Sequence, residues 1–144
     1  MSRPAPGVRA DYVSFLPLTT RWMDNDALGH LNNVVYYSLM DTAVCHGFVA
    51  RGILTWKGGA HLLMMVESGC RYHGEVAFPD AVMVGLRIAQ VGARSIRHEA
   101  GVFAGGSETA SAEGFMVHVC VDAVTRRPVA WPDVWRRSLE QAGG

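Results

Sequence analysis

Residues 33–51 read Asn-Val-Val-Tyr-Tyr-Ser-Leu-Met-Asp-Thr-Ala-Val-Cys-His-Gly-Phe-Val-Ala-Arg, and this stretch decides the fold. Its apolar residues recur at spacings of three and four, the period of an α-helix. These residues are Tyr36, Leu39, Met40, Ala43, Val44 and Phe48, with Val34, Val35, Tyr37 and Val49 widening the apolar stripe. A helix that is apolar over so much of its circumference is expected to be buried rather than to lie on a surface. Asn32 or Asn33 can serve as the N-cap, and Arg51 followed by Gly52 favours a C-terminal end there.

The segments on either side of this helix have the composition of β-strands. Before it, residues 12–22 are rich in β-branched and aromatic residues, and Pro17 places such a strand at an edge or delays its start. The strands predicted after the helix are residues 62–72, 82–88, 95–104 and 115–121, of which 82–88 and 115–121 alternate most clearly. Gly105-Gly106 fits a hairpin turn before Ser107. One strand, a long helix and four further strands predict an α+β protein with an antiparallel sheet.

Length and composition favour one compact domain. The chain has 144 residues, of which 49% are apolar, so it can bury roughly 70% of the surface that its unfolded form exposes. We expect a single domain over residues 1–144, with residues 1–11 as a flexible leader. Residues 131–140 have a short helical pattern, which we expect to pack on the outside.

The charge and the cysteines exclude several classes of protein. With 13 basic and 13 acidic residues the formal net charge is zero, so no long-range field attracts nucleic acid or an anionic membrane. No apolar run approaches the ~20 residues of a membrane-spanning helix, and the first ten residues lack the apolar core of a secretory signal. The sequence therefore predicts a cytoplasmic protein. Cys45, Cys70 and Cys120 are widely spaced without a C-x-x-C pair, and we expect free, mostly buried thiols rather than disulfides or a zinc site.

Polar residues gather immediately before the predicted helix. They are Asp24, Asn25, Asp26, His30, Asn32 and Asn33. The first peptide N–H groups of a helix have no intrahelical partners and carry the positive end of its dipole, so they can receive a developing oxyanion. A carboxylate a few residues upstream can face the same point. The alternative is that Asp24 and Asp26 only cap the helix and satisfy the turn, which is the usual role of aspartate at such a position.

Residues 22–41 strongly resemble the signature of 4-hydroxybenzoyl-CoA thioesterase-like proteins of the hotdog fold, in which D-x-D-x-x-G-H-x-N-N leads into an aromatic-rich helix. Residues 66–72, 78–80 and 125–132 follow the order expected of that family, so the resemblance covers nearly the whole chain. It implies a five- or six-stranded antiparallel sheet wrapped around one long central helix. It also implies a homodimer or homotetramer that binds acyl-CoA at the interface between two copies.

The resemblance assigns roles to several positions. The catalytic acid of the family corresponds to Asp26, as nucleophile or as general base, and the oxyanion site corresponds to the backbone N–H at Asn33, with Val34 beside it. His30 either orients the loop or touches the substrate. Asp24 is expected to be structural, although a nearby carboxylate can raise the pKa of Asp26.

The remaining candidates concern substrate binding. Some hotdog thioesterases carry their acid on the strand after the helix, which brings in Glu67, and the alternative is an exposed strand residue. Arg94 occupies a turn where related enzymes place cations for the phosphates of coenzyme A, and an ordinary solvated turn is equally compatible. The acyl pocket is expected to involve Tyr36, Tyr37, Met40, Met64 and Met65 together with residues of a second copy.

The predicted function is hydrolysis of an acyl-CoA thioester to a free acid and coenzyme A. Coenzyme A is then part of the substrate, and neither a separate cofactor nor a metal is expected. The alternatives are a thioesterase acting on an acyl carrier protein, a hotdog lyase, or a non-catalytic acyl-CoA-binding module. The acyl group and the choice between dimer and tetramer are not predicted.

Overall fold

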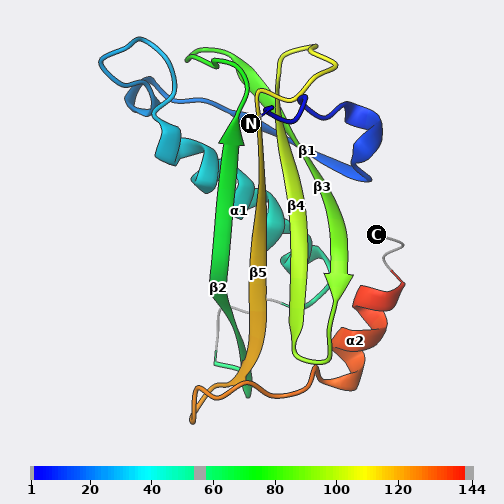
Figure 1. The fold of residues 1–144 in the computed structure, drawn as a ribbon. Helices are drawn as coiled ribbons and strands as arrows, with labels where there is room; N and C mark the ends of the chain where they lie inside the picture. The colour runs from blue at the N-terminus through cyan, green and yellow to red at the C-terminus, as the bar shows by residue number, and fades with distance from the viewer. Residues whose placement is uncertain (1, 54–57, 142–144) are drawn as a thin grey trace.

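One long helix lies against a single antiparallel sheet, as Figure 1 shows. This is a computed structural model, and it describes residues 2–53 and 58–141. The helices and strands are η1 (Arg9–Asp11), β1 (Ser14–Thr19), η2 (Trp22–Asp24), α1 (Asn33–Ala50), β2 (His61–Tyr72), β3 (Ala81–Val91), β4 (Ser95–Ala104), β5 (Ala112–Asp122) and α2 (Asp133–Glu140). The five strands take the order β1-β3-β4-β5-β2, and every neighbouring pair is antiparallel. The predicted α+β class and the five-stranded form of the sheet are confirmed.

The core fills the space between α1 and the sheet face that it covers. Alternate residues of β3, β4 and β5 point toward the helix, which is why their burial alternates along the strands. At Gly114 of β5 a Cβ atom would lie 2.7 Å from Sδ of Met40 and 2.6 Å from the Gly69 carbonyl oxygen, so only glycine fits there. The core residues on α1 are Tyr36, Leu39, Met40, Ala43, Val44 and Phe48. A smaller cluster on the other face joins Tyr12, Phe103 and Ala110.

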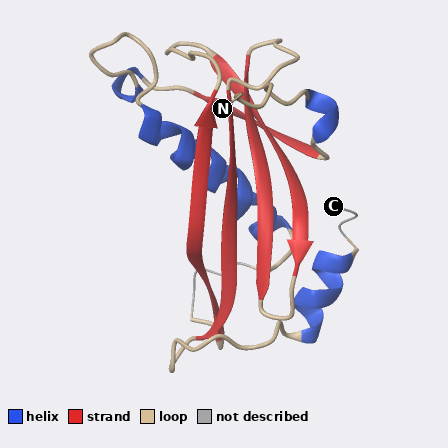
Figure 2. Cartoon of the chain, in the orientation of Figure 1, coloured by secondary structure: helices blue, strands red, loops and turns tan. Residues whose placement is uncertain are grey.

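The expectation that α1 is buried holds for one face only. Val34 is 61% exposed and Val49 is 46% exposed, because the described chain has no second layer to cover the outer side of the helix. Figure 2 shows this arrangement of one sheet and one long helix. The widened apolar stripe therefore leaves an uncovered apolar surface in a single copy.

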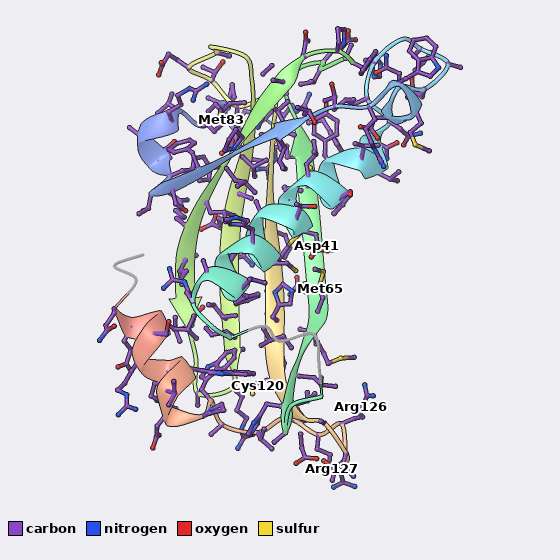
Figure 3. All side chains as sticks on the ribbon, turned by 180° about the vertical axis from the view of Figure 1, so that it is seen from behind. Asp41, Met65, Met83, Cys120, Arg126 and Arg127 are labelled. Atoms are coloured by element: carbon purple, nitrogen blue, oxygen red, sulfur yellow. The ribbon has the colours of Figure 1, made fainter. Side chains whose placement is uncertain are left out.

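Strand β2 forms one edge of the sheet, since it pairs only with β5. Its middle exposes Met64, Met65 and Val66, and the register with β5 shifts between Met65 and Glu67, where Val66 is the extra residue. Met65 is labelled in Figure 3, and it pairs with His118, which is buried on the side of the sheet that α1 covers. An edge strand with unpaired main-chain groups and exposed apolar side chains is a surface suited to pairing with another chain.

Two element boundaries differ from those expected. Strand β1 is shorter than the predicted residues 12–22, because a 3-10 turn lies on each side of it. β1 is an edge strand of the sheet, so Pro17 lies at an edge, as expected. The turn at Gly105 forms, and β5 begins at Ala112, before the predicted start at residue 115. The intervening residues bond to the N-terminal segment instead, with the Arg9 N–H donating to the Glu108 carbonyl and the Ala110 N–H donating to the Gly7 carbonyl.

The outer elements close the ends of the core. Helix α2 buries Leu139, and the Arg51 guanidinium donates to the Ser138 carbonyl at 3.0 Å, so the predicted outer helix is confirmed. No helix within the described residues is long and apolar enough to cross a membrane. The three cysteines are free, but only Cys120 is buried, while Cys45 and Cys70 are half-buried in a single copy.

Candidate functional site

The loop before α1 closes tightly on itself around Asp26. The Asp26 N–H donates to the His30 carbonyl at 2.9 Å, and the Gly29 N–H donates to the Asp26 carbonyl at 3.1 Å. Gly29 has a φ of 85°, the left-handed conformation that glycine adopts without strain. The Leu28 N–H donates to Oδ1 of Asp26 at 2.8 Å. Oδ1 is therefore held, whereas Oδ2 accepts no hydrogen bond from any residue that the structure describes.

Asp24 supports this loop from the buried side. It is 3% exposed, and its carboxylate accepts bonds from the Arg21 main-chain N–H and from the Arg21 guanidinium. Burial raises the pKa of Asp24, but the bonds from Arg21 together outweigh burial and hold the pKa below its usual value. The Asp24 carbonyl also accepts from the Asn32 N–H at 2.9 Å, so Asp24 fixes the chain on both sides of Asp26.

The N-terminus of α1 offers one unoccupied donor to the same region. Asn32 is the N-cap, and its Oδ1 accepts from the Val34 N–H at 3.1 Å. The Asn32 carbonyl accepts from the Val35 N–H at 2.9 Å. The Asn33 N–H has no partner among the described residues, so it is the free donor at this helix end. The Val34 N–H already donates to Oδ1 of Asn32, so it can bind an oxyanion only as a donor shared between the two acceptors.

Asp26, His30 and Asn33 line one cavity of about 370 Å³. The other lining residues are Leu28, Leu31, Tyr36, Tyr72, His73, Gly74 and Glu75. The Leu31 N–H donates to the Val76 carbonyl at 2.7 Å, which ties the loop to the segment that follows β2. The cavity therefore combines the predicted loop with Tyr72, His73 and Glu75. Sequence reasoning missed these three because they are distant in the chain.

Two aromatic residues hold the helix end against β2. The Tyr72 hydroxyl donates to the Asn33 carbonyl at 2.9 Å, and the Tyr72 ring meets Tyr36 edge-to-face with centroids 5.3 Å apart. Burial is the main reason that the pKa of Tyr72 rises to about 12, so its hydroxyl remains a donor at neutral pH. This bond fixes the position of the Asn33 peptide relative to the cavity.

His30 has an oxygen acceptor near each of its ring nitrogens. Its Nδ1 lies 3.2 Å from the Leu31 carbonyl oxygen, and its Nε2 lies 3.9 Å from Oε1 of Glu75. The contact of Nδ1 with the Leu31 carbonyl oxygen is within hydrogen-bond distance and orients the ring, whereas the contact with Glu75 is longer. His30 thus reaches the cavity while it also holds the loop.

Three other candidates lie away from this cavity in a single copy. Glu67 pairs with Val117, which points to the sheet face opposite α1 because its neighbours Met116 and His118 are buried on the helix side. Tyr37 is half-buried on α1 beside the core. Arg94 is exposed in the turn between β3 and β4, and its carbonyl accepts from the Cys120 N–H near the start of β2. The length of β2, about 35 Å, separates that turn from the Asp26 loop.

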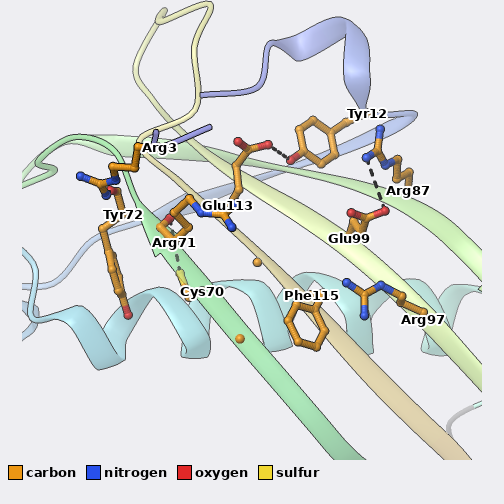
Figure 4. Close-up of a pocket in the computed structure, with 12 residues that line it drawn as sticks. Arg3, Tyr12, Cys70, Arg71, Tyr72, Arg87, Arg97, Glu99, Glu113 and Phe115 are labelled. Carbon is orange, nitrogen blue, oxygen red and sulfur yellow. Dashed lines mark hydrogen bonds and ion pairs between the residues drawn. The ribbon is translucent and has the colours of Figure 1, made fainter. Parts of the chain in front are cut away.

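A second cavity of about 650 Å³ lies on the sheet face away from α1 (Figure 4). It is lined by four arginines and two glutamates: Arg3, Arg71, Arg87, Arg97, Glu99 and Glu113. Arg87 pairs with Glu99 at 3.4 Å, and the Arg97 guanidinium lies 4.0 Å from the centroid of the Phe115 ring. Several of its charged groups are thus engaged with each other or with aromatic rings.

Known structures resemble this fold closely. The PA5185 protein from Pseudomonas aeruginosa strain PAO1 is 43% identical, with a TM-score of 0.90 over 96% of each chain. The protein SAV2348 from Staphylococcus aureus, solved in complex with CoA, is 16% identical, with a TM-score of 0.83 over 99% of this chain and 88% of that one. The 1,4-dihydroxy-2-naphthoyl-CoA thioesterase Slr0204 from Synechocystis is also 16% identical, with a TM-score of 0.81 over 90% of this chain and 97% of that one.

The sequence itself identifies the family. None of the curated proteins compared with the chain matches it significantly. The family model for the thioesterase-like superfamily, however, matches residues 20–139, which include the Asp26 loop, α1 and all strands except β1. The chain therefore belongs to the thioesterase-like superfamily.

Proposed function

We propose that this protein is an acyl-CoA thioesterase, which hydrolyses a thioester to a free acid and coenzyme A with Asp26 as its working carboxylate. One observation carries the proposal. The free Oδ2 side of Asp26 and the free N–H of Asn33 belong to residues that line the same cavity. A carboxylate can serve as the nucleophile or base of thioester hydrolysis, and an oxyanion donor at the same cavity can stabilise the charge that develops on the carbonyl oxygen.

The chemistry suits a single carboxylate. A thioester carbonyl is less stabilised by resonance than an amide, and a thiolate is a good leaving group. Asp26 either attacks the carbonyl carbon directly, giving a mixed anhydride, or removes a proton from an attacking water. In both routes the Asn33 N–H would hold the negative oxygen, a contribution of roughly 3 kcal/mol per donor in other enzymes.

The surrounding hydrogen bonds support this assignment by fixing both groups before substrate arrives. The Leu28 N–H holds Oδ1 of Asp26, which leaves the other oxygen to react. The Tyr72 hydroxyl holds the Asn33 peptide through its carbonyl. Donors and nucleophiles that are held in place need no reorganisation when charge develops, which is the source of their catalytic effect.

Coenzyme A is the proposed carrier of the acyl group. The fold is shared with a protein solved in complex with CoA and with a thioesterase named for a CoA thioester, which favours the same carrier here. Arg94 remains our proposed contact for the phosphates, and its distance from Asp26 means that it would have to come from a second copy.

We further propose a homodimer that pairs the two β2 edges around a two-fold axis. An antiparallel pairing would place the end of β2 in one copy beside the start of β2 in the other, so the Arg94 turn of one copy would approach the Asp26 cavity of the other. The same pairing would cover Met64, Met65 and Val66, which are 42%, 40% and 61% exposed in a single copy.

A substrate panel tests the proposed activity. Purified protein is mixed with aromatic and aliphatic acyl-CoA thioesters and with acyl carrier protein thioesters, and the released thiol is measured with a chromogenic disulfide. We expect release from at least one acyl-CoA. Thiol release from acyl carrier protein substrates alone would show that the acyl carrier is a protein and not coenzyme A. No release from any thioester would refute the proposed activity.

A further inference from the structure

A second histidine, His73, lines the same cavity as Asp26 and is held by a carboxylate behind it. His73 follows β2 directly, and the N–H groups of His73 and Gly74 both donate to the Ser111 carbonyl, at 2.8 and 2.9 Å. Its side chain is 7% exposed. The imidazole is therefore placed at the cavity by rigid backbone rather than by a mobile loop.

The carboxylate behind the ring is Glu113 of β5. Nε2 of His73 is buried and lies 3.3 Å from Oε1 of Glu113, an ion-pair distance without hydrogen-bond geometry among the described residues. Glu113 also accepts from the Gly7 N–H at 2.7 Å and from the Tyr12 hydroxyl at 2.5 Å, a bond drawn in Figure 4. These two donors fix the position of the Glu113 carboxylate beside His73.

This arrangement decides which nitrogen of His73 carries the proton. A carboxylate opposite Nε2 stabilises the tautomer with hydrogen on Nε2, and that tautomer leaves the lone pair on Nδ1. His73 lines the cavity, and because its Nε2 lies beside Glu113, Nδ1 is the ring nitrogen left for water or substrate. His30 differs, because its Nδ1 is already in contact with the Leu31 carbonyl oxygen.

We propose that His73 is the general base of the hydrolytic half of the reaction and that Glu113 is its positioning residue. This rests on the proposed thioesterase function and assigns Asp26 the nucleophilic role. Once Asp26 is acylated it cannot also activate water, so the second half of the reaction requires another base. The nucleophile, the base and the carboxylate that orients the base are then three separate residues.

The proposed reaction has two covalent steps. An Asp26 carboxylate oxygen adds to the thioester carbonyl carbon, the C–S bond breaks, and its electron pair leaves on the sulfur as the thiolate of coenzyme A. Water oxygen then bonds to the acyl carbon of the anhydride while its proton passes to Nδ1 of His73. The bond between the acyl carbon and the Asp26 oxygen breaks and returns its electron pair to Asp26. The imidazolium gives its proton to the thiolate, and the released acid ionises.

Rapid mixing separates the two halves of this reaction. In His73→Gln we expect a burst of thiol release approaching one equivalent per active site, followed by steady-state turnover at least about 100-fold slower than in the wild type. The burst itself shows that the sites are folded and that Asp26 still reacts. His46→Gln, at an exposed position on α1, is the matched control, and we expect it to keep wild-type turnover.

The positioning role of Glu113 has its own readout. We expect Glu113→Gln to lower kcat with KM unchanged, and we expect the acidic limb of the kcat profile against pH to move in both His73→Gln and Glu113→Gln. A merely structural role would leave that profile in place. Turnover of His73→Gln within about twofold of wild type, or loss of the burst together with turnover in folded protein, would overturn the proposal. Wild-type protein that hydrolyses no thioester would instead refute the proposed function itself.

Discussion

At the scale of single residues, the Asp26 carboxylate and the Asn33 peptide owe their placement to a few short bonds. Arg21 holds Asp24, Asp24 holds the Asn32 peptide, and Asn32 caps the helix. These contacts join residues close in sequence, so the motif alone was enough to predict that Asp26, His30 and Asn33 meet. Tyr72, His73 and Glu75 come from more than 35 residues further along, and only the register of β2 brings them to the cavity.

Two buried histidines predict how stability depends on pH. His98 and His118 each meet the Phe48 ring edge-to-face, and each has a buried Nδ1 with no hydrogen-bond partner among residues 2–53 and 58–141. Burial, with smaller contributions from His118 and Arg51, lowers the pKa of His98 from 6.5 to about 4. Burial also lowers the pKa of His118, which Asp41 partly opposes.

The sign follows from proton binding. Between pH 6.5 and about 4 the unfolded chain binds more protons at His98 than the folded chain, so stability is full above pH 6.5 and falls as the pH is lowered through this window. A pKa difference of this size is worth about 3 kcal/mol. Urea unfolding at a series of pH values measures the effect, and His98→Leu should flatten the curve. Parallel curves for the variant and the wild type would contradict it.

At the scale of elements, the helix and the strands were largely predictable because each carries a period in its own residues. The predicted helix 33–51 and the observed Asn33–Ala50 agree within a residue at each end. The path of the chain between the Gly105 turn and β5 was not predictable, since it depends on main-chain bonds from Arg9 to Glu108 and from Ala110 to Gly7 that join distant segments. The apolar periodicity of α1 did not show which of its residues pack against the sheet and which lie on the outer face of the helix.

The contact of α1 with β5 predicts a sharp size limit at Gly114. In Gly114→Ala the new methyl would meet both Met40 and the Gly69 carbonyl oxygen, and the latter is backbone that yields little. We expect a loss of about 1–3 kcal/mol in the free energy of unfolding, measured by urea denaturation. Gly106→Ala is the matched control, because its Cβ meets nothing within 4 Å. Equal stability of the two variants would contradict the packing described here.

At the scale of the whole molecule, a single copy leaves the β2 edge and the outer face of α1 uncovered. The proposed pairing across β2 explains two observations together. It would cover this surface, and it would bring Arg94 of one copy toward Asp26 of the other. The sequence indicated such pairing only through family resemblance, because the apolar residues of an edge strand look the same whether a second copy covers them or not.

The pairing predicts a specific effect of charge on β2. Val66→Asp should convert a dimer to a monomer in sedimentation velocity and lower thioesterase activity, because two buried carboxylates would face the axis region without partners. Val124→Asp is the control, since Val124 is 91% exposed in the turn after β5. A wild-type protein that is monomeric, or a Val66→Asp protein that remains dimeric, would refute pairing through β2.

Asp26 is proposed to be the catalytic carboxylate, and the most direct test is the rate of thiol release from the best acyl-CoA substrate. The rate is compared for the wild type, Asp26→Asn and the control Asp133→Asn, which changes an exposed aspartate. The carboxamide preserves the size of the side chain and its bond from the Leu28 N–H but removes the nucleophile. We predict a loss of at least about 100-fold in kcat for Asp26→Asn, with folding unchanged and Asp133→Asn fully active. Turnover of folded Asp26→Asn at the wild-type rate would contradict the account.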